Sequence, residues 1–439
     1  MLLKLLLISG KGVYKSIDAG KTWDHIGLAK AGQIGAVEID PTNSNIVWVA
    51  AIGDAFKANE ERGIYKTIDG GATWEKMLHI SNTTGFADLE LLPGNPNVVY
   101  AAAWKAQRTP WTIISGGENK EGGIYKSVNG GKDWIKLETG LPKGLIGKID
   151  LAVSAVDSSI LYAVIEAPGD EGGVYKSVDQ GKTFVQTSSN KGLVNRPFYY
   201  TNIELDPTNP DIVYSNANPL LKSTDGGKNW TMMAVPHGDN HDIWINPNNP
   251  NLLIQCNDGG ANVSHNGGKT WSSQFNQPTA EIYEVAVDVQ YPYWIYGAQQ
   301  DNTTIAIPSS APSGTSVQGT QVMIEVGGCE TGPSIPKPGD HNIVYNNCKG
   351  RFSVYNKITG TGREYSIGAS NIYGHNPKDL KYRFQRVAPV HVSPHDPDVV
   401  YMGSQFVHKT RNDGVIWETI SPDLTAFEAD KQVVSGNPI

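Results

Sequence analysis

The sequence has 439 residues, with 36 Lys and Arg against 44 Asp and Glu, which gives a formal net charge of −8. This charge argues against a nucleic-acid partner, because phosphate polyanions attract basic surfaces. The 48 Gly and 26 Pro are typical of many short strands joined by tight turns. No stretch is long and apolar enough to span a membrane.

The first residues, Met1-Leu-Leu-Lys-Leu-Leu-Leu-Ile8, are apolar and lead directly into Gly12-Val-Tyr-Lys-Ser16. A signal peptide needs a longer apolar core and a small-residue cleavage site. We therefore expect residues 2–8 to form a strand that precedes Gly12-Val-Tyr-Lys-Ser16, and the chain to begin inside a repeat unit.

One eight-residue pattern, here called the box motif, occurs seven times. Its first copy is Ser16-Ile-Asp-Ala-Gly-Lys-Thr-Trp23. An Asp or Asn can hydrogen-bond the backbone two residues on, and Gly supplies the positive φ of a tight turn, so the motif predicts a hairpin. The predicted structural Asp and Asn residues are Asp18, Asp69, Asn129, Asp179, Asp225, Asn266 and Asn412.

A second motif alternates with the box motif and is typified by Asp40-Pro-Thr-Asn and Asp206-Pro-Thr-Asn. Each copy leads into an apolar strand that usually ends in an aromatic residue, and these strand ends recur roughly every 50 residues, which is the length of a propeller blade. One unit is therefore a strand, an Asp-Pro turn, a strand, a loop, a strand, a box turn and a strand.

Eight full units and a partial N-terminal one can be counted, with the box motif decayed in the sixth and seventh. The sequence predicts an all-β β-propeller of four-stranded blades over residues 1–425. Either an incomplete large ring or two adjoining propellers fits this count, and the tail at 426–439 could complete the N-terminal blade.

In such a blade both kinds of repeated turn lie on one face, and the irregular loops lie on the other, where binding groups are usual. Five carboxylates there are candidates for acid–base catalysis of glycoside hydrolysis: Glu60, Glu61, Asp239, Asp301 and Glu330. The candidates for holding a polar, ring-containing ligand such as a sugar are Arg62, Arg108, Trp111, Arg196, Tyr199, His237, His241, Gln300, Tyr382 and Arg383.

Structural roles are the alternatives for several of these residues. Glu60 and Arg62 could form a solvated pair, Arg108 could hold its loop, and Gln300 could satisfy backbone groups at a bend. His237, Asp239 and His241 alternate, so an extended chain would place all three on one side. A hydrogen-bonded network is favoured over a metal site there, and we predict no metal and no cofactor.

The three cysteines, Cys256, Cys329 and Cys348, lack the paired spacing of a metal site. Cys329 and Cys348 could pair in an oxidising compartment, but free buried thiols are the favoured interpretation.

The box motif resembles the Asp-box, or bacterial neuraminidase repeat, of β-propellers such as sialidases, xyloglucanases and sortilin. Residues 12–439 also resemble a group of bacterial sortilin-like or glycosyl-hydrolase-like repeat proteins. The segments that carry this resemblance include Arg108-Thr-Pro-Trp111, His237-Gly-Asp-Asn-His-Asp-Ile-Trp244, Asn257-Asp-Gly-Gly260 and Tyr296-Gly-Ala-Gln-Gln-Asp-Asn302. The resemblance implies an extracellular or periplasmic β-propeller that is longer at both ends than this chain.

The sequence departs from the enzymes of this kind. The Arg-Ile-Pro signature of sialidases is absent, and no xyloglucanase carboxylate pair can be assigned residue by residue. Gly327-Gly-Cys-Glu-Thr-Gly332 stands where the family has Gly-Gly-Gly-Glu-Ser-Gly and keeps the carboxylate. A polysaccharide-binding module is therefore the favoured function; a glycoside hydrolase and a sortilin-like peptide-binding or structural module are the alternatives.

Overall fold

The computed structural model describes residues 10–108, 113–117, 121–274, 277, 280–310, 322–369 and 375–433. The expected strand at 2–8, the candidate Trp111 and the last residues of the tail lie outside these ranges. Contacts divide the chain into two compact units, one that ends at Gln274 and one that follows it. The division into repeats at 1–425 and a tail at 426–439 stays a prediction.

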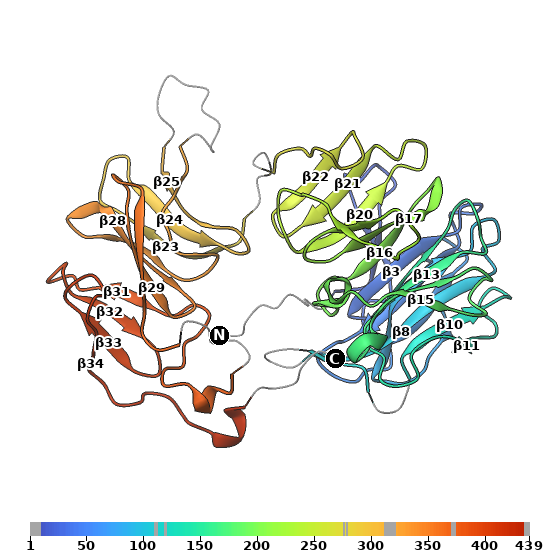
Figure 1. Ribbon diagram of the computed structural model, residues 1–439, viewed down its shortest axis with the longest axis horizontal. Coiled ribbons are helices and arrows are strands. Elements are labelled where there is room, and N and C mark those ends of the chain that lie inside the picture. Colours follow the sequence, from blue (N-terminus) through green and yellow to red (C-terminus); the bar gives the residue numbers. More distant parts are fainter. Residues whose placement is uncertain are drawn as a thin grey trace. The chain divides into compact units, whose positions relative to one another are not determined.

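The first unit begins with a hairpin of β1 (Val13–Lys15) and β2 (Asp24–Gly27) and continues with five sheets, here called blades (Figure 1). The first blade is β3 (Gln33–Ile39), β4 (Val47–Gly53), β5 (Gly63–Thr67) and β6 (Glu75–Leu78); the second is β7 (Thr84–Leu91), β8 (Val99–Arg108), β10 (Gly123–Ser127) and β11 (Ile135–Leu137), with β9 (Ile113–Ser115) paired to β8. The third is β12 (Ile149–Val153), β13 (Leu161–Ile165), β14 (Gly173–Ser177) and β15 (Val185–Ser188). The fourth is β16 (Asn202–Asp206), β17 (Asn209–Asn216), β18 (Leu221–Ser223) and β19 (Thr231–Met232), and the fifth is β20 (Asn240–Ile245), β21 (Leu253–Asn257) and β22 (Gly260–Ser264).

The second unit contains the sixth to eighth blades. The sixth is β23 (Ile282–Val287), β24 (Trp294–Gln299), β25 (Thr304–Pro308) and β26 (Ile324–Glu325). The seventh is β27 (Ser334–Lys337), β28 (Asp340–Cys348), β29 (Arg351–Asn356) and β30 (Thr361–Ser366), and the eighth is β31 (Val390–Val392), β32 (Val400–Gly403), β33 (Val407–Thr410) and β34 (Glu418–Thr419). Helical structure in the described residues is limited to short 3₁₀ turns at Gly169–Glu171, Lys191–Val194, Pro377–Asp379 and Ala429–Lys431.

The predicted fold is confirmed. Every blade is an antiparallel meander in sequence order, and the sixth and seventh blades form although their box motifs have decayed. The fifth blade differs from the prediction, because it has three strands instead of four. After Trp271 the backbone N–H of Ser272 still bonds Val263, but no fourth strand follows in the described residues.

The hydrophobic cores lie between neighbouring blades. Tyr100 and Ala102 of the second blade pack with Leu151 and Leu161 of the third in one buried cluster. The first strands of successive blades, β3, β7, β12, β16 and β20, contact one another in turn. This is the packing of propeller blades, in which each sheet buries its faces against its two neighbours.

The box turns are held by more hydrogen bonds than the sequence predicted. In the second copy, Asp69 accepts the backbone N–H of Thr73, four residues on, at 2.9 Å and the Thr73 hydroxyl at 2.6 Å. The hydroxyl of Thr67 donates to Asp69 and accepts the N–H of Gly71. The expected bond two residues on is therefore made by the Thr67 hydroxyl, which accepts the N–H of Asp69.

Both kinds of repeated turn share one face of each blade. Gly70 of a box turn donates to Asn45 of the Asp-Pro turn in the same blade at 2.9 Å, and Gly226 donates to Asp211 in the fourth blade at 2.9 Å. The opposite end of each blade, here called the loop face, carries the turns between second and third strands and the links between blades. No helix among the described residues is long and apolar enough to cross a membrane.

Candidate functional site

Several predicted ligand-binding residues meet on the loop face of the fourth and fifth blades. The links that lead into β16 and β20, the start of β20 itself and the turns after β17 and β21 supply them. The Arg196 site, as we call it, comprises Arg196, Tyr199, Tyr200, Asn218, Asp239, His241 and Asp258. All of these residues belong to the first unit.

Asp239 is the central acceptor of the Arg196 site. Its Oδ2 accepts from Arg196 Nη1 at 3.1 Å, and its Oδ1 accepts from Asn218 Nδ2 at 2.6 Å and from the Tyr200 hydroxyl at 3.4 Å. Both oxygens are therefore engaged, and Asp239 holds its neighbours in place instead of offering a carboxyl to a ligand.

Arg196 and Tyr199 form the open part of the site. The Arg196 side chain is 53% exposed, and its guanidinium carbon lies 5.9 Å from the centre of the Tyr199 ring. Such a cation over an aromatic face is favourable and keeps both groups in one geometry. Tyr200 below is buried, and burial holds the pKa of its hydroxyl well above the usual range.

His241 completes the Arg196 site. Its Nε2 donates to Asp258 Oδ1 at 2.6 Å, and its ring centre lies 5.5 Å from that of Tyr199. His237 lies beside it, because the ring of His237 packs against Gly259, which follows Asp258. Among the described residues no group of three or more His, Cys, Asp and Glu side chains could hold a metal ion.

Arg62 does not reach a surface, which corrects its assignment as a ligand-binding residue. It is 1% exposed, and its guanidinium donates to the backbone carbonyls of Thr83, Asp54 and Ala106 and to Asn59 Oδ1. Arg62 therefore closes the loop between β4 and β5, because an arginine can satisfy several buried carbonyls at once.

Arg108 is also buried, but it belongs to the neighbourhood of the Arg196 site. The backbone N–H of Arg108 donates to Ala55 O. Burial lowers the pKa of the Arg108 guanidinium, and the nearby Tyr199 acts in the opposite direction. Glu60 is exposed, and Glu61 accepts from Asn59 Nδ2 at 3.3 Å.

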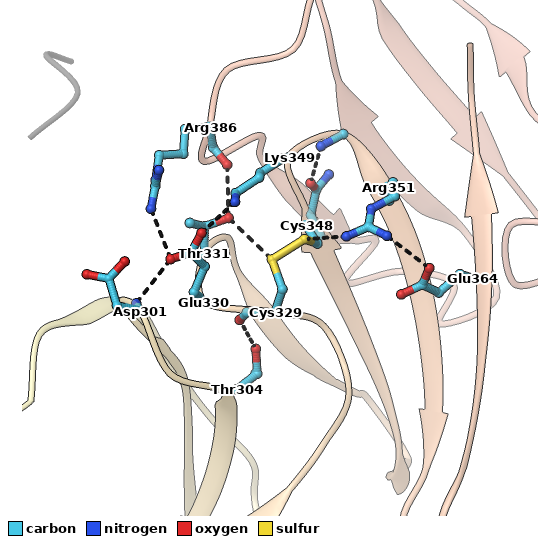
Figure 2. Close-up of a disulfide and its surroundings, with 12 residues drawn as sticks. Asp301, Thr304, Cys329, Glu330, Thr331, Cys348, Lys349, Arg351, Glu364 and Arg386 are labelled. Carbon is cyan, nitrogen blue, oxygen red and sulfur yellow. Dashed lines mark hydrogen bonds and ion pairs between the residues drawn. A yellow bond between two sulfur atoms is a disulfide. The ribbon is translucent and has the colours of Figure 1, made fainter. Parts of the chain in front are cut away.

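The second unit holds a separate polar cluster around Glu330 (Figure 2). Glu330 accepts from Lys349 and from the backbone N–H of Asp301, and Arg386 lies 3.2 Å away. Burial acts to raise the pKa of Glu330, but the Asp301 and Lys349 hydrogen bonds and the Arg386 charge lower it to about 2. Glu330 is therefore an anion that cannot protonate a leaving group near neutral pH.

Cys329 and Cys348 form a disulfide beside this cluster, so the favoured interpretation of free thiols is wrong for them (Figure 2). Their Cα atoms are 5.5 Å apart, and the bond joins the residues next to Glu330 and Lys349. Cys256 is free and half-buried. The sequence could not decide this pairing, because it depends on where the sixth blade's last loop meets β28.

The other candidates of the second unit are occupied by their own neighbours. Gln300 accepts from the Tyr283 hydroxyl and donates to Asp301. Arg383 donates to Asp423 and Thr425 at 2.8 Å each and lies over the Phe427 ring. Tyr382 packs edge-on against His408. These contacts favour structural roles over ligand binding.

A row of carboxylates on the first strands of the blades was not predicted from the sequence: Glu38, Asp88, Glu90, Asp150 and Glu204. Burial raises the pKa of Asp88 to about 6, although the hydrogen bond from Leu151 N–H acts to lower it. Burial and, to a smaller extent, the charge of Asp88 raise the pKa of Glu38 to about 7. Burial and four neighbouring carboxylates hold the pKa of Glu90 well above its usual range. Acidic residues alternating with leucines in Asp88-Leu-Glu-Leu91 were the available signal.

A cavity of about 250 Å³ lies elsewhere, between the second and third blades, and is lined by residues such as Lys136, Leu141 and Ile149. It contains none of the candidate residues.

Comparisons with known proteins find distant relatives. No protein-family model matches the chain. Over 208 residues, 45% of this chain, it is 24% identical to the photosystem II assembly lipoprotein Ycf48 of Nostoc sp.. Over 244 residues, 50% of this chain, it is 25% identical to the xyloglucanase Xgh74A of Acetivibrio thermocellus. These matches span 53% and 28% of the two relatives' own lengths.

Solved structures give the same two kinds of protein. An ancestral GH74 enzyme aligns with 95% of this chain and 68% of its own at 14% identity and a TM-score of 0.43. The structure titled "YCF48 bound to D1 peptide" aligns with 82% of this chain and 99% of its own at 14% identity and a TM-score of 0.40. The chain therefore has weak sequence similarity to a xyloglucanase and to Ycf48.

Proposed function

We propose that the protein binds a polysaccharide at the Arg196 site. The observation that carries this proposal is the pairing of a half-exposed arginine with an aromatic face, both held in place by neighbouring side chains. Arg196 is fixed by Asp239, and Tyr199 packs against Tyr200 and His241. Rigid aromatic and guanidinium groups bind planar polar ligands at little entropic cost.

The relatives support a carbohydrate ligand, since one of them is named as a xyloglucanase. The site also lies on the loop face, away from the structural box turns, which we propose are Asp-boxes of the sortilin-like kind. The Cys329–Cys348 disulfide supports an extracellular or periplasmic location, because disulfides persist in oxidising compartments.

Affinity electrophoresis through gels that contain xyloglucan, pectins or other plant and bacterial polysaccharides tests the proposal. Arg196→Ala and Tyr199→Ala should each weaken retardation by about tenfold in Kd, or about 1.4 kcal/mol. Arg411→Ala is the matched control, because Arg411 is also exposed and paired with an aspartate, Asp396 at 2.9 Å, but lies in a box turn.

Unchanged binding in both site variants would mean that the polysaccharide binds at another place on the protein. Binding of peptides but not glycans on arrays would favour the sortilin-like alternative, and no ligand at all would favour a structural partner. Either result would overturn polysaccharide binding.

Glycoside hydrolysis is the second candidate, and it is consistent with the xyloglucanase relative. Of the five carboxylates predicted from the sequence, Asp301 and Glu330 come together, through the hydrogen bond of Asp301 N–H to Glu330 at 3.1 Å. Because the pKa of Glu330 is lowered to about 2, Glu330 could serve only as the anionic carboxylate of a catalytic pair. Release of reducing ends from xyloglucan that is lost in Asp301→Asn would support this candidate.

A further inference from the structure

His241 is placed by an irregularity of its strand. Asn240 pairs with Asn257 and Asp242 pairs with Cys256, so His241 stands between them without a partner on β21. It is a bulge residue, and bulges re-aim a side chain next to functional sites. The His241 side chain is 35% exposed and packs against the rings of both Tyr199 and Tyr200, which also contact each other.

Asp258 fixes the proton on this imidazole. Its Oδ1 accepts from Nε2 at 2.6 Å, and its side chain is 11% exposed, so the contact is largely shielded from water. A carboxylate only accepts, so in the neutral imidazole the hydrogen sits on Nε2 and the lone pair on Nδ1. This is the arrangement in which an aspartate orients a histidine that acts as a base.

A histidine can take a proton from carbon only when a neighbouring group makes that carbon acidic. In a uronic-acid residue the neighbouring group is a carboxylate, and an arginine that neutralises it lowers the barrier. Arg196 is the half-exposed cation of the site, within contact of Tyr199. Tyr199 in turn interacts with the buried charge of Arg108, which stabilises the anion that remains if Tyr199 gives up its proton.

We propose that the Arg196 site cleaves uronic-acid polysaccharides by β-elimination, with His241 as the general base and Asp258 as its positioning residue. This inference rests on the proposed polysaccharide binding at the same site.

The step balances without a cofactor or oxidant. His241 Nδ1 takes the proton from the carbon that bears the carboxylate, and the electron pair of that C–H bond forms a carbon–carbon double bond. The bond to the glycosidic oxygen at the next carbon breaks, and this oxygen takes the proton of the Tyr199 hydroxyl. His241 then returns its proton to Tyr199. One chain ends in an unsaturated uronide and the other in a hydroxyl group.

Incubation of the full chain with polygalacturonate, alginate and hyaluronan, followed by ultraviolet absorbance of the unsaturated uronide and by reducing-end release, tests the inference. We expect both signals to rise together on at least one polymer. His241→Ala should lower kcat by about 10²- to 10⁴-fold. Asp258→Asn should lower kcat more than it changes KM and should move the acidic limb of the pH profile, which a merely structural role would not do.

Affinity electrophoresis of the same variants separates the two proposals. If His241→Ala still binds a polymer but no unsaturated product forms with wild type, elimination is overturned and binding stands. Reducing ends without ultraviolet absorbance would mean hydrolysis and would also overturn it. If wild type binds no uronic-acid polymer, elimination is overturned; polysaccharide binding then stands if xyloglucan or another neutral polysaccharide is bound and is overturned if none is. Arg411→Ala, which keeps the site intact, should retain full activity.

Discussion

The carboxylates on the first strands predict that the first unit is more stable at mildly acidic pH than above neutrality. Asp88→Asn is the sharpest perturbation, because Asp88 is 9% exposed and accepts the backbone N–H of Leu151 at 2.8 Å. An asparagine oxygen can keep that bond while the charge disappears. The charges that act around Asp88 are those of Glu38, Glu90, Asp150 and Glu204, opposed by Lys148.

The sign follows from linkage. The pKa of Asp88 is raised from 3.8 to about 6, so the folded unit binds this proton more tightly than the unfolded chain. The resulting loss of unfolding free energy is absent below about pH 4, grows between about pH 4 and 6, and is complete above that range. At 1.36 kcal/mol per pH unit, the penalty is at most about 3 kcal/mol, and neighbouring carboxylates share it, so we expect Asp88→Asn to gain about 1–3 kcal/mol near pH 8.

Thermal and urea unfolding followed by tryptophan fluorescence near pH 4 and near pH 8 measures this gain. The midpoint of Asp88→Asn should exceed that of wild type by roughly 3–8 °C near pH 8 and coincide with it near pH 4. Asp157→Asn is the control: Asp157 is an exposed turn carboxylate whose pKa is lowered by its hydrogen bonds to Ser159, so its removal should not stabilise. Equal destabilisation of Asp88→Asn at both pH values would refute the reasoning.

Two further predictions concern the scaffold. Replacement of Cys329 and Cys348 by Ser should lower the free energy of unfolding by about 3 kcal/mol, given a sequence separation of 19. Reduced wild type should unfold at the same midpoint as this variant. No difference between oxidised wild type and the variant would mean that the disulfide does not form. Arg62→Ala should destabilise the first unit by more than about 3 kcal/mol, because it leaves buried carbonyls without a hydrogen-bond donor. Arg62→Lys should recover only part of this loss, since a lysine lacks the planar guanidinium that bonds several carbonyls at once. A midpoint for Arg62→Ala as close to wild type as that of Arg411→Ala would contradict the structural role of Arg62.

The fold could be predicted because each blade repeats two local signals. Box turns and Asp-Pro turns bond mainly within themselves, as Asp69 and Thr67 do, so a short window of sequence specifies them. The alternation of the two turns then fixes the strand order and both faces of each blade. The missing fourth strand of the fifth blade was not predictable, because its box motif at Asn266 is intact.

The candidate site was predicted as a region and only in part as residues. Arg196, Tyr199, Asp239 and His241 meet because the links before β16 and β20 open onto the same face. Arg62 looked equally suitable in the sequence, but its loop folds back over it, and no local pattern shows which carbonyls an arginine will meet. The carboxylates of the first strands were missed for a related reason, since their effect arises only when blades stack.

The bulge at His241 shows how a common repeat acquires a special residue. A bulge occurs at the same position of the second blade, where Asp88 follows Phe86 in the pairing with β8 and Ala87 is the extra residue. Ala87 packs into a buried apolar cluster with Trp104, so there the bulge serves packing. In the fifth blade the extra residue is an imidazole with a carboxylate beside it. The backbone irregularity therefore recurs in more than one blade, whereas the chemistry depends on the side chain placed there and on Asp258, 17 residues away.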